Sequence, residues 1–352
     1  MTLLTHAFRG LATLVLTALC LTYVVFWLTH LAPNLEKLAR TQGSARMADD
    51  AVVTWLANRG YDQPLPVLYG QWLGVLLGSV VTGTDGEVRA RCADGAAPAT
   101  DTPPRCGILQ GDWGTSTVLR DDVGQIIATR LALTGKLMGW VLVLMVPGAL
   151  VMGILAGMRE GGRLDRGLST VSILTTATPE YVSGVVLIAV FATGSFGITW
   201  FKGTATAAMD DATFANFTLP VVTIALFGMG YIARMTRASM AEVMTAPYIR
   251  TARLKGVRFR DIVLRHALRN ALIAPFTVIM LQIPWLLNGV VVVETLFNYK
   301  GFGWTLVQAA ANNDIDLLLG VSVVSVTVVL ATQFLSDVGY ALLNPRIRTG
   351  AA

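Results

Sequence analysis

Charged side chains are scarce in this chain of 352 residues: Asp, Glu, Lys and Arg together make up 14% of it, while 54% of the residues are hydrophobic. A soluble globular chain carries roughly 25% charged residues. Because so little charge cannot cover a water-exposed surface of this size, much of the surface must face lipid. The net charge of +5 is modest, and the basic residues lie beside apolar segments, which argues against a nucleic-acid-binding protein.

Motifs of enzymatic chemistry are also missing. The sequence contains no G-x-x-x-x-G-K-[ST] loop, no H-E-x-x-H and no G-x-S-x-G. Its three histidines, His6, His30 and His266, are dispersed, so the sequence predicts no metal site. We therefore expect no catalytic residues, and any uphill transport must draw its energy from an ion gradient or from a partner protein.

Six apolar runs are long enough to cross a bilayer, which takes about 20 residues in a helix. They cover residues 11–31, 131–158, 168–196, 219–236, 271–293 and 317–343. The first run is too long for a removed signal peptide and lacks a small-residue cleavage site, so we interpret it as an anchor. Six spans place both termini on the same side of the membrane.

Basic residues identify that side, because Lys and Arg near span ends resist translocation. They concentrate in residues 159–167, 247–270 and 346–348, which all fall on one face. The opposite face holds residues 32–130, where acids slightly outnumber bases. The pattern predicts cytoplasmic termini and an extracytoplasmic region between the first two spans.

The extracytoplasmic region contains two helix-like stretches, near residues 45–60 and 68–79, and then a stretch at 81–110 that we expect to be irregular. Cys92 and Cys106 lie in this last stretch. They indicate a disulfide in an oxidising compartment, and the alternative is two free thiols in a mobile loop. Cys20, inside the first span, is interpreted as an ordinary small apolar residue.

Within the apolar runs, only a few polar or small residues are candidates for a functional or packing role. Glu180 follows Pro179 in the third run, and a carboxylate at membrane depth is either a functional residue in the translocation path or a group solvated at a kink. Lys136 is the other ionisable candidate, but its long side chain can reach an interface. Gly153 and Gly157 share one helix face, a spacing that allows two helices to approach closely.

The segment 247–270, "PYIRTARLKGVRFRDIVLRHALRN", carries seven Lys or Arg and one acid, Asp261. Pro247 favours a helix start and Gly256 a helix end, so we predict a short helix at 248–255 and a second one at 258–270. In the second helix Ile262, Val263 and Ala267 form an apolar stripe. A topology signal explains the charge but not two amphipathic helices, so we favour a docking surface.

The segment "YIRTARLKGVRFRDIVLRHALRNALIAP" resembles the cytoplasmic coupling loop of ABC-importer permeases, in the branch for dipeptides, oligopeptides and nickel. "LTHLAP", "GYDQPL", "GDWGTS", "LPVVTIALFGMGYIARMTRASM" and "ALLNPRIR" match other stretches of that family. The resemblance implies an all-α integral membrane protein of the bacterial plasma (inner) membrane, with six transmembrane helices, a type I importer permease fold and an extracytoplasmic insertion between helices 1 and 2. Its parts would be 1–130 (first helix and extracytoplasmic region), 131–345 (permease core with coupling loop 238–270) and 346–352 (cytoplasmic tail).

The resemblance further implies a second homologous permease, two ABC ATPase subunits that hold ATP and magnesium, and an extracytoplasmic substrate-binding protein. This chain would bind no cofactor and would form half of an alternating-access path for di- and oligopeptides. Nickel or another small solute is the alternative substrate. An ion-coupled stand-alone carrier and a membrane-embedded peptidase are the other classes, and the scarcity of intramembrane charge and of a nucleophile–base pair argues against them. The ATPase contact would consist of Tyr248, Arg250, Thr251, Ala252, Arg253, Lys255 and Gly256.

Three features depart from the family pattern. Arg250 stands where the broader importer signature has Glu, as is common in this branch. Residues 81–110 resemble an insertion, and "YKGFG" at 299–303 replaces the usual "P-G-L-G". The last two lie where the binding protein would dock.

Overall fold

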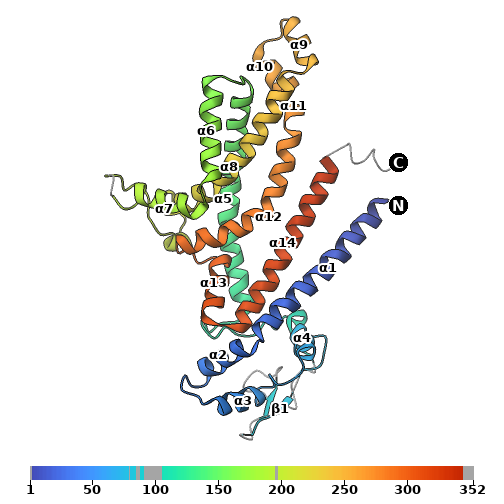
Figure 1. The fold of residues 1–352 in the computed structure, drawn as a ribbon, viewed down its shortest axis with the longest axis vertical. Helices are drawn as coiled ribbons and strands as arrows, with labels where there is room; N and C mark the ends of the chain where they lie inside the picture. The colour runs from blue at the N-terminus through green and yellow to red at the C-terminus, as the bar shows by residue number, and fades with distance from the viewer. Residues whose placement is uncertain (1, 79, 85–87, 91–104, 195–196, 344–352) are drawn as a thin grey trace. The chain divides into compact units, whose positions relative to one another are not determined.

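The computed structural model describes residues 2–78, 80–84, 88–90, 105–194 and 197–343. The chain forms two compact units, Met1–Arg130 with Thr305–Leu330, and Leu131–Trp304 with Ala331–Ala352. Figure 1 shows the elements of both. The division into 1–130, 131–345 and 346–352 stays a prediction, and residues 346–352 lie outside the described part.

The first unit is built from helices and one small hairpin. Its elements are α1 (Thr2–Thr29), α2 (Ala32–Gln42), α3 (Asp49–Ala57), α4 (Leu65–Leu73), β1 (Val80–Thr82), β2 (Val88–Ala90) and η1 (Ile108–Gln110), together with parts of α5 (Val123–Gly157), α13 (Phe302–Asn312) and α14 (Ile315–Leu343). Phe26, Leu38, Leu68 and Trp72 pack on Ile315 and Leu319 in its core.

The hairpin corrects the expectation of an irregular stretch at 81–110. β1 and β2 are antiparallel, and Val80 pairs with Ala90 and Thr82 with Val88. The β-branched residues of "VVT" favour an extended backbone, but the flanking Gly, Asp and Thr concealed this short strand among turn residues.

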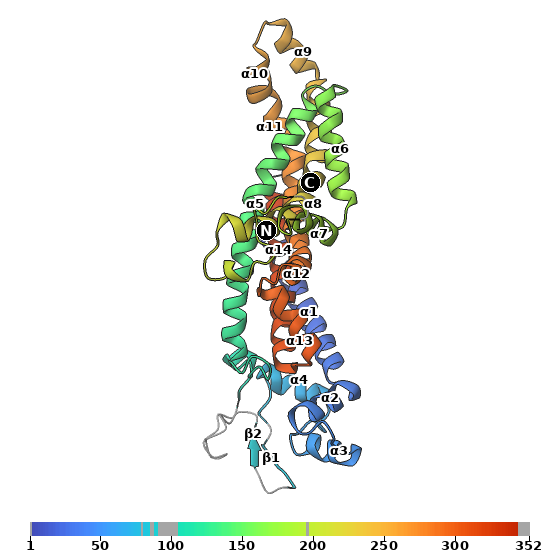
Figure 2. The ribbon, with the colours of Figure 1, turned by 90° about the vertical axis from the view of Figure 1, so that its left-hand side faces the viewer.

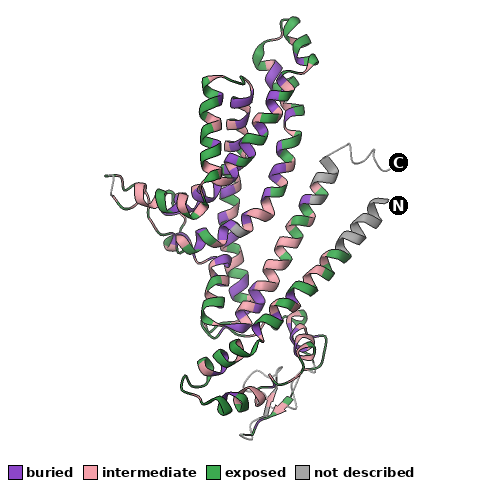
Figure 3. Ribbon diagram, in the orientation of Figure 1, coloured by how far each residue is buried: buried purple, intermediate pink, exposed green. Residues whose placement is uncertain are grey.

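The second unit is helical throughout its described part and centres on α8. Its elements are α5 after Arg130, α6 (Arg163–Ala177), α7 (Glu180–Phe191), η2 (Thr206–Ala208), α8 (Phe214–Met244), α9 (Pro247–Leu254), α10 (Phe259–Asp261), the π-helix η3 (Ile262–Ala267), α11 (Leu268–Ala271), α12 (Ile273–Leu296) and the remainder of α13 and α14. The capping box of Thr213 and Asn216 starts α8. Figure 3 shows that α8 is largely buried, whereas α6 exposes its outer side.

Within the described residues, four helices are long and apolar enough to span a membrane, and up to six spans result if each of two bent helix pairs counts as one. The pair α6 and α7 bends by 108°, and the helical segment 259–271 meets α12 at 51°. The third predicted span is therefore not one straight helix. Its break falls at Thr178, which takes an extended backbone before Pro179, as the residue before a proline usually does.

Close approach between α5 and α8 confirms the interpretation of the two glycines. A Cβ on Gly153 would lie 2.6 Å from the Ala233 carbonyl oxygen, and one on Gly157 would lie 2.7 Å from the Arg237 carbonyl oxygen. Any side chain at these positions would push α5 away from α8, so small residues are required there.

Candidate functional site

The predicted docking segment forms a short helix seated on the end of α8. Pro247 begins α9, after Ala246 in extended conformation, and Figures 1 and 2 show α9 and α10 at one end of the second unit. Ile249 is fully buried and packs in one cluster with Met240 and Met244 of α8 and with residues of η3. The buried isoleucine fixes which face of α9 points outward.

The outward face of α9 is basic and well exposed. Tyr248, Arg250, Thr251, Arg253, Lys255 and Gly256 are exposed, and Ala252 is half-buried. Among the described residues, Arg250, Arg253 and Lys255 have no acidic partner within salt-bridge distance. The structure thus brings the sequence-predicted contact residues together on one surface.

Leu254 is a member of this surface that sequence reasoning missed. It is 81% exposed, which is unusual for a leucine at the end of a helix whose other large aliphatic residue, Ile249, is buried. The available signal was its position, five residues after Ile249 and therefore on a different face of a 3.6-residue helix. An exposed leucine among unpaired cations suits a partner surface that is apolar and acidic.

Gly256 takes a backbone that favours glycine. Its φ is +73°, in the left-handed region that other residues adopt only with strain, which confirms its predicted role at the helix end. The second predicted helix is only partly correct, because the π-helix at Ile262–Ala267 interrupts it. Ile262, Val263 and Ala267 are all buried, so the predicted apolar stripe is confirmed, and π-turns of this kind are frequent at functional sites.

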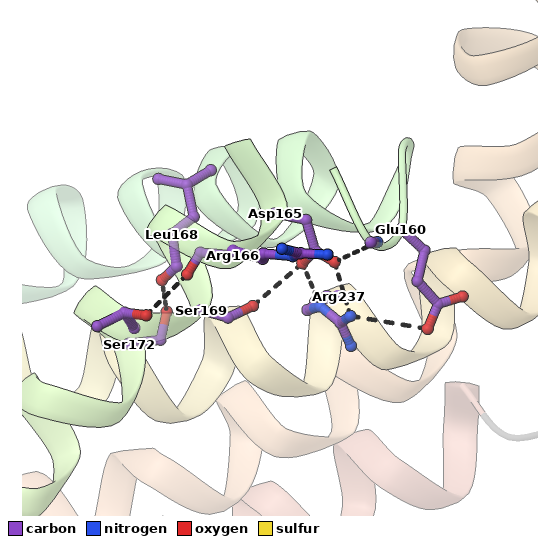
Figure 4. Close-up of polar contacts among 9 residues, drawn as sticks. Glu160, Asp165, Arg166, Leu168, Ser169, Ser172 and Arg237 are labelled. Atoms are coloured by element: carbon purple, nitrogen blue, oxygen red, sulfur yellow. Dashed lines mark hydrogen bonds and ion pairs between the residues drawn. The ribbon is translucent and has the colours of Figure 1, made fainter. Parts of the chain in front are cut away.

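An ion pair between buried Asp165 and half-buried Arg237 joins α6 to α8 (Figure 4). Asp165 is 3% exposed, and Arg237 donates through both Nε and Nη2, with Nη2 2.8 Å from Oδ2. The Gly161 backbone N–H and the Ser169 hydroxyl also donate to this carboxylate, at 2.8 and 3.1 Å. Glu160 lies 3.6 Å from Arg237 but is 59% exposed. Sequence reasoning missed this pair, although an acid among the arginines of 159–167 was a usable signal.

Glu180 begins α7 directly after the break in the third span. A Cβ on Gly289 would lie 2.7 Å from each of its carboxylate oxygens, so the carboxylate rests against the backbone of α12. Its Oε1 is buried and has no hydrogen-bond partner among the described residues. A desolvated carboxylate oxygen without a donor is costly and marks a place where a cationic group would be stabilised.

Glu294, at the end of α12, is a second acid that sequence reasoning missed. It is fully buried, accepts a hydrogen bond from the Thr134 hydroxyl and accepts another from the Trp304 backbone N–H at 2.9 Å. Gly301 passes so close to this carboxylate that it has no room for a Cβ, and a Cβ on Gly303 would lie 2.8 Å from the Cα of Val291 and 3.2 Å from the carboxylate. The "YKGFG" stretch is therefore folded around a buried carboxylate, which lay one residue beyond the predicted end of the apolar run.

Hydrogen bonds from buried polar groups also hold the stretch "GDWGTS" in the first unit. Asp314 is fully buried and accepts hydrogen bonds from the Ser116 hydroxyl at 2.6 Å and the Val118 N–H at 3.1 Å. Cys106 is buried and disulfide-bonded, while Cys92 lies outside the described residues, so their pairing stays a prediction. Within the described ranges, no group of three or more His, Cys, Asp or Glu side chains is placed to hold a metal ion.

Comparison with known proteins identifies the family of this chain. The family model described as "Binding-protein-dependent transport system inner membrane component" matches residues 149–349, more than half of the chain. The chain belongs to this family. The family's members are permease subunits of ABC importers, in which separate subunits carry the ATPase activity, so this chain is a non-enzymatic, multi-pass inner-membrane permease that works with ATPase and binding-protein components.

Three relatives illustrate the similarity. The probable peptide ABC transporter permease protein y4tP of Sinorhizobium fredii is 34% identical over 244 residues, covering 68% of this chain and 77% of the relative. The oligopeptide transport system permease protein AppB of Bacillus subtilis is 33% identical over 248 residues, with the same coverage. The glutathione transport system permease protein GsiC of Pectobacterium atrosepticum is 31% identical over 352 residues, covering 98% of this chain and 99% of the relative.

Proposed function

We propose that this permease imports di- and oligopeptides. The support is that all three relatives described above are named for peptide, oligopeptide or glutathione transport, and glutathione is itself a small peptide. Nickel or another small solute is the competing substrate class, and nothing in the described part of the chain favours it over peptides.

The permease would work in a complex with a second permease, two ATPase subunits and an extracytoplasmic binding protein, with both of its termini in the cytoplasm. ATP and magnesium would be held by the ATPase subunits, and this chain would bind no cofactor. The two permeases would form the path together and expose it alternately to each side of the membrane.

The segment around α9 would be the contact with an ATPase. One observation carries this part of the proposal: α9 is anchored by a buried Ile249, while its opposite face presents unpaired cations and an 81% exposed Leu254. A rigidly seated helix can transmit a displacement, whereas a mobile basic loop cannot. Half-buried Ala252 leaves room for a partner to approach the helix closely.

Glu180 would lie in the translocation path. Its partnerless oxygen beside Gly289 is suited to the α-ammonium group that every unblocked peptide carries, because a buried carboxylate gains most from a cation that replaces lost water. This role predicts that Glu180→Gln weakens transport of free peptides more than transport of N-acetylated ones.

Reconstitution would test the function. Vesicles containing the complete complex should accumulate radiolabelled di- and oligopeptides when ATP is supplied on the ATPase side, and should not accumulate Ni²⁺. Vesicles containing this chain alone should accumulate neither. Uptake by the isolated chain driven by an ion gradient would instead identify a stand-alone carrier, and uptake of Ni²⁺ but not peptides by the complete complex would replace the substrate class.

A further inference from the structure

We propose that the Asp165–Arg237 pair is a mechanical link, which makes α6 follow the motion that α8 receives from α9. Arg237 binds the carboxylate through two guanidinium nitrogens, a fork geometry that fixes both the distance and the angle between the two groups. The pair lies between α6 and α8, two helices of the same unit (Figure 4). The inference rests on the proposed coupling role of α9.

The connection between α9 and α8 is short and well ordered. Thr245 and Ala246 donate backbone hydrogen bonds to Glu242 and Val243 at 3.3 and 3.0 Å, so the chain between the helices has little freedom. Ile249 packs on Met240 and Met244. A displacement of α9 therefore reaches the end of α8 that carries Arg237, two turns before Met244.

Helix α6 packs along α8, and two of its close attachments can be assigned to residues. A Cβ on Gly230 would lie 2.5 Å from the Ser172 carbonyl oxygen, so the two backbones nearly touch there. The second attachment is the ion pair, seven residues further along α8, or about 10 Å at 1.5 Å per residue. The ion pair is the directional contact of the two, because its fork geometry fixes the angle between the groups as well as their distance.

A displacement of α6 would move α7. The two helices are joined through Thr178 and Pro179 at a bend of 108°, and α7 begins with Glu180 against Gly289 of α12. The ion pair is thus the positioning element in a continuous series from α9, through α8 and α6, to the carboxylate proposed for the path. Neither Asp165 nor Arg237 touches the substrate in this proposal.

The test measures peptide imported per ATP hydrolysed by the complete complex in vesicles. Asp165→Asn removes the charge without changing the side chain's size, and Arg237→Lys keeps the charge but loses the fork. Both variants should lower the ratio at least about fivefold, the low end of typical coupling between sites. Glu160→Gln is the matched control, because it removes an exposed carboxylate from the same arginine, and it should leave the ratio within about twofold.

A purely structural pair would give a different result: the variants would lower the yield or melting temperature of the complex, while the assembled fraction imported peptide at the normal ratio. That outcome overturns the proposal. Leu254→Asp is measured in parallel, because a normal ratio in that variant would refute the coupling role of α9 itself rather than the link.

A chemical cross-link in place of the ion pair provides a test that does not depend on folding defects of the single variants. In a chain with the exposed Cys20 replaced by Ala, Asp165→Cys with Arg237→Cys should show a low ratio that a short bifunctional thiol reagent restores. If the cross-link instead blocks transport, the two helices must separate during the cycle and the proposal is wrong.

Discussion

Replacing Gly256 tests whether the turn after α9 holds this helix in a working position. A Cβ on Gly256 would meet no atom within 4 Å, so a larger side chain causes no clash, and the only cost arises from the φ of +73°. An L-residue in the left-handed region pays about 1–2 kcal/mol, and a β-branched residue such as valine lies at the upper end of this cost. Asparagine tolerates this region better than other residues.

The strain competes with the anchor of α9. Seating one buried isoleucine contributes about 1.5–3 kcal/mol, which is close to the strain that Gly256→Val would introduce. The chain is then balanced between a strained, seated helix and a relaxed, unseated one. Since about 1.4 kcal/mol corresponds to a factor of 10 in an equilibrium, a strain that cancels the anchoring energy leaves about half of the helices seated, and we expect substrate-stimulated ATP hydrolysis to fall at least about twofold in Gly256→Val.

The assay is a series in the reconstituted complex, with membrane insertion checked for each variant. Activity should decrease in the order Gly, Asn, Ala, Val, because this order follows the cost of a positive φ rather than side-chain volume, in which Asn exceeds Ala. Normal stimulated hydrolysis in Gly256→Val would refute the coupling role of this turn. Equal loss in all three variants would show that backbone conformation is not the cause.

Three further predictions concern packing and covalent structure. Gly157→Leu should lower the melting temperature of the detergent-solubilised protein through about 1–3 kcal/mol of overpacking, whereas Gly135→Leu, on the same helix with nothing near its Cβ, should not; equal effects would contradict the close helix contact. Glu294→Gln should destabilise the protein by about 1–3 kcal/mol, because an amide N–H₂ group would face a backbone N–H donor, and an unchanged melting temperature would mean that this carboxylate does not hold the "YKGFG" stretch. Cys92 and Cys106 should resist thiol labelling until a reductant is added, and equal labelling before and after reduction would exclude the disulfide.

The sequence was sufficient for features that depend on local patterns. Apolar runs located the spans because a bilayer demands about 20 consecutive apolar residues. Pro247 and Gly256 indicated the two ends of α9. Proline fixes φ at a value that suits the first turn of a helix, and glycine permits the positive φ that often ends one. Gly153 and Gly157 indicated a helix contact, although their spacing could not identify α8 as the partner.

The sequence did not predict which helices contact each other. Asp165 and Arg237 are 72 residues apart, and nothing in either neighbourhood specifies the other. Glu294 is linked to Thr134 across 160 residues, and it was overlooked because a buried acid at the end of an apolar run resembles a residue in a solvated loop. The 108° bend lies at Thr178 and Pro179, where the proline indicated a break in the helix, but a proline does not predict the angle of the bend.

The breaks in the helices indicate where this unit can deform. Helix α8 runs from Phe214 to Met244 with one proline, Pro220, near its start, and α5 cannot slide freely against it, because Gly153 and Gly157 bring the two backbones into contact. Conformational change is therefore expected in the π-helix leading to α12, where regular α-helical hydrogen bonding is interrupted, whereas α7 follows α6. Helices α7 and α12 meet at Glu180 and Gly289. A displacement of α9 would thus move α5 and α8 as one body. It would change mainly the position of the Glu180 carboxylate relative to α12.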